Sequence, residues 1–165
     1  MARILVAYAS KLGSTREIAE AIGNELRVAG HEAAVVGVND ARSIVGYDAV
    51  IVGSALYAAH WQRDANRFVQ QHLVRLQAMP VWLFSSGPLD PRQAVVDLPI
   101  TPHAAEVTDA IGARGHRTFG GRLQADASID PQVLATHPIG DFRPWDQIRA
   151  WAASIAGALQ EPPPA

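Results

Sequence analysis

Short apolar runs alternate along the chain with longer segments that are apolar on one side only. The runs that have the length and composition of β-strands cover residues 3–9, 33–38, 49–54, 80–86 and 117–121. The first, third and fourth runs are apolar almost throughout, which is typical of strands buried on both faces of a parallel sheet. We therefore predict a sheet that is covered on both sides.

The segments between and after these runs repeat apolar residues every three or four positions, as amphipathic helices do. They cover residues 18–29, 65–76, 102–112 and 144–159. Thr101 is a good N-cap for the third helix, and the proline that follows it suits the first helical position. Because strands and helices alternate, each strand–helix–strand unit is expected to form a right-handed crossover in a parallel sheet.

The predicted fold is an α/β three-layer sandwich in which a five-stranded parallel sheet has the order 2-1-3-4-5. The chain has 165 residues, of which 48% are hydrophobic, and this suits one domain. We expect the domain to span residues 1–160, and residues 161–165, with three consecutive prolines, to form a disordered tail. Residues 122–143 form an unusually long connection, which we expect to be functional or mobile.

Charge and composition exclude several classes of function. The net charge is −2, from 14 basic and 16 acidic side chains, so nucleic acid is not an expected partner. The chain has no cysteine, which excludes thiolate catalysis and iron–sulfur clusters, and its six histidines are too dispersed for a metal site. No apolar run approaches the ~20 residues of a transmembrane segment. We expect a cytoplasmic protein, for which contact with a membrane surface stays open.

In parallel α/β sheets, ligands bind beyond the carboxyl ends of the strands where the strand order reverses, here after the first and third strands. The loop after the first strand holds three hydroxyl residues, one glycine and the only lysine of the chain: Ser10, Lys11, Leu12, Gly13, Ser14 and Thr15. Its hydroxyls and the N–H groups of the following helix could bind a phosphate. Alternatively, Ser14 and Glu17 form a capping box. The glycine spacing matches neither a P-loop nor a dinucleotide-binding loop.

The loop at residues 10–15 resembles the flavodoxin signature, in which a hydroxyl-rich loop with one glycine surrounds the phosphate of FMN. Residues 47–54, before the second ligand loop, are similar to those of the flavodoxin-like branch that contains the menaquinone-dependent protoporphyrinogen oxidases. The resemblance covers residues 3–160 and is strongest in the first half. It implies a flavodoxin-like fold and FMN as the cofactor.

The resemblance also implies which residues surround the flavin. The loop after the third strand would lie against the ring, with Tyr57 as the stacking side chain and Trp61 as a second candidate; a place for Trp61 in the core is the alternative. The members of this loop are Ser54, Ala55, Leu56, Tyr57, Ala58 and Trp61. The loop after the fourth strand would present main-chain N–H groups to the pyrimidine side of the ring. Its members are Ser86, Gly87, Pro88 and Leu89, of which the proline cannot donate.

One departure from flavodoxins concerns the loop after the third strand. Residues 54–61 contain no glycine, and Ala58 and Ala59 stand where electron-shuttling flavodoxins place one. Holding a residue other than glycine at positive φ costs on the order of 1 kcal/mol. We therefore expect the one-electron-reduced flavin to be poorly stabilised and two-electron chemistry to be favoured.

The predicted function is that of an FMN-binding oxidoreductase. A quinone, a reductase or a small-molecule substrate is the expected redox partner, and the resemblance suggests protoporphyrinogen as one substrate. No catalytic acid or base is assigned, because the flavin itself carries the chemistry. Two alternatives stay open: a small FMN electron carrier like flavodoxin, and a flavodoxin-like interaction module without a flavin.

Overall fold

The computed structural model describes residues 1–87, 98–124, 130–136 and 139–161. The parallel strands are β1 (Arg3–Ala9), β2 (Glu32–Gly37), β3 (Ala49–Tyr57), β5 (Val81–Ser86) and β6 (Gly115–Phe119), in the order β2-β1-β3-β5-β6. A short strand, β4 (His60–Trp61), pairs antiparallel with the end of β3. Counted along the chain, the parallel strands have the order 2-1-3-4-5, so this prediction is confirmed.

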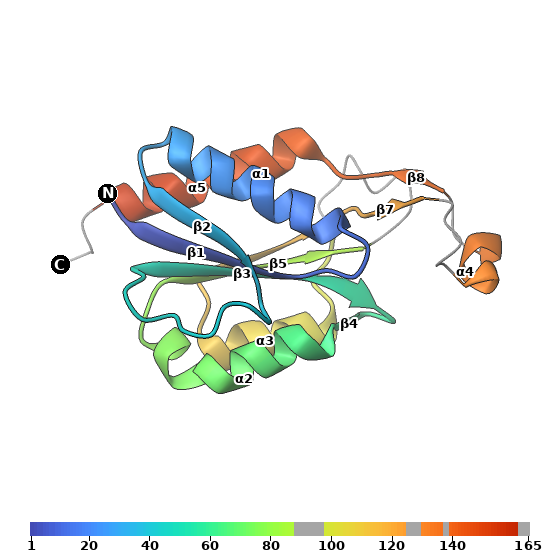
Figure 1. Cartoon of the computed structure of the whole chain (residues 1–165), viewed down its shortest axis with the longest axis horizontal. Helices are drawn as coiled ribbons and strands as arrows, with labels where there is room; N and C mark the ends of the chain where they lie inside the picture. Colours follow the sequence, from blue (N-terminus) through green and yellow to red (C-terminus); the bar gives the residue numbers. More distant parts are fainter. Residues whose placement is uncertain (88–97, 125–129, 137–138, 162–165) are drawn as a thin grey trace.

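Helices cover both faces of the sheet (Figure 1). The helices α1 (Ser14–Val28) and α5 (Trp145–Gln160) lie on one face, and α2 (Arg63–Gln77) and α3 (Pro102–Ile111) lie on the other. The α3 helix begins as predicted, because Thr101 Oγ1 accepts a hydrogen bond from the N–H of Ala104 at 3.3 Å. The three-layer sandwich is therefore confirmed. No helix in the described part of the chain is both long and apolar enough to cross a membrane.

An apolar core lies on each side of the sheet. Ile4 and Ile51 pack toward α1 and α5, whereas Leu5 and Val50 pack toward α2 and α3. Each of these four side chains is at most 1% exposed. Because successive residues of a strand point to opposite faces, a strand in the middle of the sandwich needs an apolar residue at every position. This explains the continuous apolar runs in the sequence.

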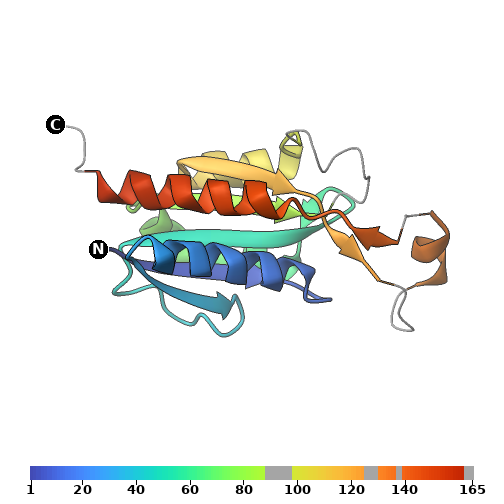
Figure 2. The same cartoon turned by 90° about the horizontal axis from the view of Figure 1, so that it is seen from above.

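A two-stranded ribbon extends beyond the carboxyl ends of the parallel strands (Figures 1 and 2). It consists of β7 (Arg122–Leu123) and β8 (Gly140–Asp141), and the short helix α4 (Pro131–Thr136) lies at its far end. We call the described residues from 121 to 143 the arm. The sequence predicted only a long connection here, because strands of two residues show no recognisable period.

Two strands differ from their predicted bounds by more than one residue at an end. The β3 strand continues past residue 54 because Ala55 pairs with Ser86 of β5 and the next two residues pair with β4. The β6 strand begins two residues earlier than predicted, since its pairing with β5 starts with Gly115 opposite Trp82. Both differences arise from pairing with a partner strand, which apolar periodicity alone does not reveal.

Candidate functional site

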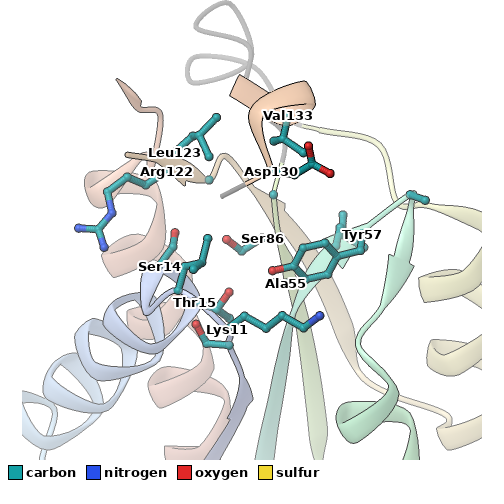
Figure 3. A pocket seen from close by; sticks show the side chains of 16 residues that line it. Lys11, Ser14, Thr15, Ala55, Tyr57, Ser86, Arg122, Leu123, Asp130 and Val133 are labelled. Atoms are coloured by element: carbon teal, nitrogen blue, oxygen red, sulfur yellow. The ribbon is translucent and has the colours of Figure 1, made fainter. Parts of the chain in front are cut away.

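A cavity of about 480 Å³ opens at the carboxyl ends of β1, β3 and β5 (Figure 3), within the size range of small-molecule sites. The cavity has four wall segments: three lie at the carboxyl ends of β1, β3 and β5, and the arm supplies the fourth. The lining residues are Ser10, Lys11, Leu12, Ser14 and Thr15; Ala55, Leu56, Tyr57 and Ala58; Ser86 and Gly87; and Gly121, Arg122, Leu123, Asp130 and Val133. The structure thus brings together most of the residues that the sequence predicted.

The loop between β1 and α1 ends in a tight turn at Gly13, whose φ of 85° is unfavourable for residues other than glycine. The N–H of Gly13 donates to Ser10 Oγ at 3.0 Å. The helix begins at Ser14, and its first backbone hydrogen bond joins the N–H of Glu17 to the carbonyl of Gly13. The N–H groups of the first turn therefore have no partner within the helix, which makes this end favourable for an anion.

The capping box that the sequence left open is not formed. Ser14 is the first residue of α1 rather than its N-cap, and Glu17 pairs with arginines instead of reaching back along the helix. Ser14 Oγ is buried without a hydrogen-bond partner. A buried hydroxyl without a partner costs about 1–3 kcal/mol. Because Ser14 also lines the cavity, its hydroxyl is suited to donate to an acceptor bound there.

The β3–β4 hairpin turns through Ala58 and Ala59, whose φ values are 48° and 65°. A two-residue hairpin turn of type I′ requires positive φ at both central positions, so the strand pairing imposes this conformation on the alanines. The carbonyl of Ala58 accepts a hydrogen bond from His60 Nδ1 at 2.8 Å. The turn therefore already holds two alanines at positive φ, the conformation whose cost we expected from the sequence. The expected preference for two-electron chemistry stays a prediction.

Tyr57 forms the wall of the cavity opposite Arg122 (Figure 3). Its side chain is 45% exposed, and Lys11 Nζ lies 5.0 Å from the centre of its ring. Burial of its inner part raises the pKa of the Tyr57 hydroxyl, so the group stays protonated at neutral pH. An aromatic face beside an open cavity can stack on a planar ligand.

Three of the predicted site residues in the described part of the chain do not line the cavity: Gly13, which forms the turn before α1, and Trp61 and Ser54. Trp61 is 3% exposed and belongs to the core beside α2, where its Nε1–H donates to Ser85 Oγ at 2.8 Å. The structure thus supports the core alternative for Trp61. Ser54 is fully buried, and its hydroxyl donates to the carbonyl of Ala55 and accepts from the N–H of Gln62. Through these two hydrogen bonds, Ser54 stabilises the β3–β4 segment without lining the cavity.

The predicted loop after β5 is described only in part. Ser86 and Gly87 line the cavity, whereas Pro88 and Leu89 lie outside the described residues. The N–H of Gly87 donates to the carbonyl of Phe119 at 3.2 Å. The prediction that this N–H faces a ligand is therefore wrong, because pairing between β5 and β6 continues by one more hydrogen bond.

The arm contributes residues that sequence reasoning did not identify. They are Gly121, Arg122, Leu123, Asp130 and Val133. Asp130 Oδ1 accepts a hydrogen bond from the N–H of Gln132 at 2.8 Å, so part of its role is to begin α4. The unusual length of the segment was the one signal available in the sequence, since which of its residues face the cavity depends on how the arm folds back.

These features define an α/β protein with a mononucleotide-type site at the point where the strand order reverses. The N-terminus of α1 faces one part of this site, and the aromatic side chain of Tyr57 faces another. Residues 5–126 match the family model of the flavodoxin domain. Since this match spans most of the chain, the chain belongs to the flavodoxin family. Flavodoxin domains bind FMN, which is accordingly the cofactor of this chain.

Among curated proteins, the protoporphyrinogen IX dehydrogenase [quinone] of Escherichia coli (strain K12) is 31% identical over 85 residues, which are 50% of this chain and 47% of that protein. The chain thus matches about half the length of this relative. Among solved structures, a flavodoxin from the domain Archaea has a TM-score of 0.67 at 16% identity, over 96% of this chain and 99% of that one. The oxidised flavodoxin 2 of Bacillus cereus has a TM-score of 0.61 at 22% identity, over 97% and 100% of the two chains.

A larger protein contains the same fold as one part. The rubredoxin oxygen:oxidoreductase of Desulfovibrio gigas has a TM-score of 0.67 at 17% identity, over 96% of this chain but 36% of that one. At such identities the structural likeness concerns the fold alone.

Proposed function

We propose that the cavity binds FMN with its phosphate at the loop of residues 10–15 and its ring beside Tyr57. The observation that carries this proposal is the buried, unpartnered hydroxyl of Ser14 at the N-terminus of α1. A phosphate oxygen would accept from this hydroxyl and from the N–H groups of the first helical turn. Thr15, which is 1% exposed, also lines this end of the cavity.

The other end of the cavity suits an isoalloxazine ring. Leu56 and Tyr57 form one wall, and Leu123 and Val133 of the arm add further apolar surface. Such walls exclude water from a bound flavin and disfavour additional negative charge on it. When bound, FMN supplies the transfer of one or two electrons, and the protein supplies position and environment.

We further propose that the protein is a quinone-linked dehydrogenase, with protoporphyrinogen as the first substrate to test. The support is the similarity to the Escherichia coli protein of that name, which extends over half of the chain. A small electron carrier is the second candidate, because several of the structural neighbours are flavodoxins. The net charge of −2 disfavours the carrier, since shuttles dock through strongly charged faces.

Flavin binding is tested first, by fluorescence titration. We expect FMN to bind more tightly than riboflavin, which lacks the phosphate, and Ser14→Ala to weaken FMN by about tenfold with little change for riboflavin. Ser154→Ala serves as the matched control and should change neither affinity, because Ser154 does not line the cavity and its hydroxyl donates to the carbonyl of Trp151 within α5. Purified protein that is colourless and takes up no FMN would refute the site and favour an interaction module.

The reaction is tested separately, with protoporphyrinogen as electron donor and a soluble menaquinone analogue as acceptor. We expect oxidation well above the rate of autoxidation, in proportion to bound FMN. No turnover above autoxidation, together with rapid cytochrome reduction when a flavodoxin reductase is supplied, would instead establish an electron carrier.

A further inference from the structure

Arg143, at the end of the arm, is a buried cation held by three different elements. Its side chain is only 3% exposed. Its Nε and Nη2 donate to the two carboxylate oxygens of Asp141 at 2.8 and 2.7 Å, and its guanidinium lies 4.5 Å from the ring centre of Trp145. Its Nη1 donates to Glu17 and to the carbonyl of Ser14 at 3.3 Å. The arm is thus joined directly to the first turn of α1.

Glu17 carries a negative charge at the end of the helix where we place the phosphate. Its carboxylate is shared by Arg143 and by Arg122, whose Nη1 lies 3.3 Å from it. Arg122 itself lines the cavity and turns its guanidinium toward α1 (Figure 3). The hydrogen bond from Arg143 is the main reason why the pKa of Glu17 is lowered. The carboxylate is therefore ionised at neutral pH and needs these partners.

The four charged side chains of this cluster balance one another. Arg122 and Arg143 contribute two positive charges, and Glu17 and Asp141 contribute two negative charges. Removing one arginine leaves an uncompensated carboxylate beside a site for an anion. In a partly buried setting, repulsion between charges several ångströms apart is large enough to change affinity by about tenfold or more.

We infer that Arg143 is a positioning residue for the cofactor phosphate, because it neutralises Glu17 in the first turn of α1. The inference rests on the proposed placement of FMN. Asp141 partners only Nε and Nη2 of Arg143, so the contacts of Nη1 to Glu17 and Ser14 are what connect Arg143 to the phosphate end of the cavity.

The test compares Arg143→Gln, Glu17→Gln and the double variant by titration with FMN and with riboflavin. Arg143→Gln should weaken FMN about tenfold and riboflavin less than about twofold, since riboflavin has no phosphate to be repelled. Glu17→Gln should leave FMN binding unchanged or tighter, and in the double variant it should recover much of the loss. The loss should shrink at high salt, because screening weakens charge repulsion.

Arg149→Gln is the matched control, because Arg149 forms an exposed ion pair with Asp146 on α5 and should affect neither ligand. If Arg143→Gln does not fold, the effect of Glu17→Gln on FMN affinity decides the question. If Arg143 served only to attach the arm to α1, Glu17→Gln would weaken FMN binding as well, because it removes one of the contacts between the arm and the helix. Equal losses for FMN and riboflavin, or weakened FMN binding in Glu17→Gln, would overturn the inference. Wild-type protein that binds both flavins equally would instead refute the proposed phosphate site.

Discussion

At the turn between β3 and β4, two alanines adopt a conformation that residues with a side chain seldom take. Ala58 and Ala59 both have positive φ, at a cost of about 1 kcal/mol or more each. The turn persists because Leu56 pairs with the buried Trp61, and because His60 donates a hydrogen bond to the carbonyl of Ala58. Local strain at the edge of the cavity is thus maintained by packing outside the turn.

Ala59→Gly should therefore stabilise the protein. We expect the free energy of unfolding to rise by about 0.5–1 kcal/mol, because the relief of strain exceeds the extra entropy of glycine in the unfolded chain. Ala153→Gly, at an exposed position of α5, is the control and should lower the free energy of unfolding by about 1 kcal/mol. Urea denaturation measures both; a decrease of the same size in the two variants would contradict the assignment of strain.

The arm is the element that completes the cavity, and its attachment depends on one close approach of two backbones. A Cβ atom at Gly120 would lie 2.1 Å from the carbonyl oxygen of Phe142, so the segments that enter and leave the arm can lie together only with glycine there. The N–H of Phe142 donates to the carbonyl of Gly121 at 2.9 Å, directly before β7 begins. Arg143 adds an ionic contact to Glu17 of α1.

Gly120→Ala should disrupt this attachment. We expect the free energy of unfolding to fall by about 1–3 kcal/mol from overpacking, and FMN binding to weaken because Arg122 and Leu123 shift with the arm. Gly157→Ala in α5 is the control: nothing lies near its added Cβ, and alanine favours the helix by about 1 kcal/mol. Unchanged stability and FMN affinity in Gly120→Ala would show that the two backbones are not tightly joined.

For the molecule as a whole, titratable groups make stability depend on pH. Ser85 Oγ accepts a hydrogen bond from the Trp61 indole at 2.8 Å and forms a second hydrogen bond with His116 Nε2, also at 2.8 Å. Burial lowers the pKa of His116 to about 4. Hydrogen bonds from Arg143 lower the pKa values of Glu17 and Asp141 as well. All three groups bind protons more readily in the unfolded chain.

The free energy of unfolding should accordingly decrease as the pH falls. Between pH ~6.5 and ~4 the unfolded chain takes up a proton at His116 that the folded protein does not, which removes roughly 2 kcal/mol. Below the ordinary pKa values of Glu and Asp, Glu17 and Asp141 lower stability further. Denaturation at several pH values measures this, and His116→Gln should flatten the upper part of the profile. A wild-type profile that is flat between pH ~6.5 and ~4 would show that His116 titrates normally.

Much of the fold followed from local patterns. The continuous apolar runs at 3–9, 49–54 and 80–86 indicated strands buried on both faces, and all three are found in the middle of the sheet. The hydroxyl-rich loop indicated the place of the phosphate site, and the structure puts that loop on the wall of the cavity. Such features are visible in the sequence because side-chain period and turn chemistry act over a few residues.

The remaining features depended on contacts between distant segments. Trp61 was a candidate for the site, yet the β3–β4 pairing turns it into the core, and the same pairing forces positive φ on two alanines. Arg143 meets Glu17 across 126 positions of the chain. The sequence by itself determined the five parallel strands, the four long helices and the chemistry of the loop after β1. Only the tertiary structure decided which side chains share the cavity, because burial and charge pairing belong to surfaces that folding brings together.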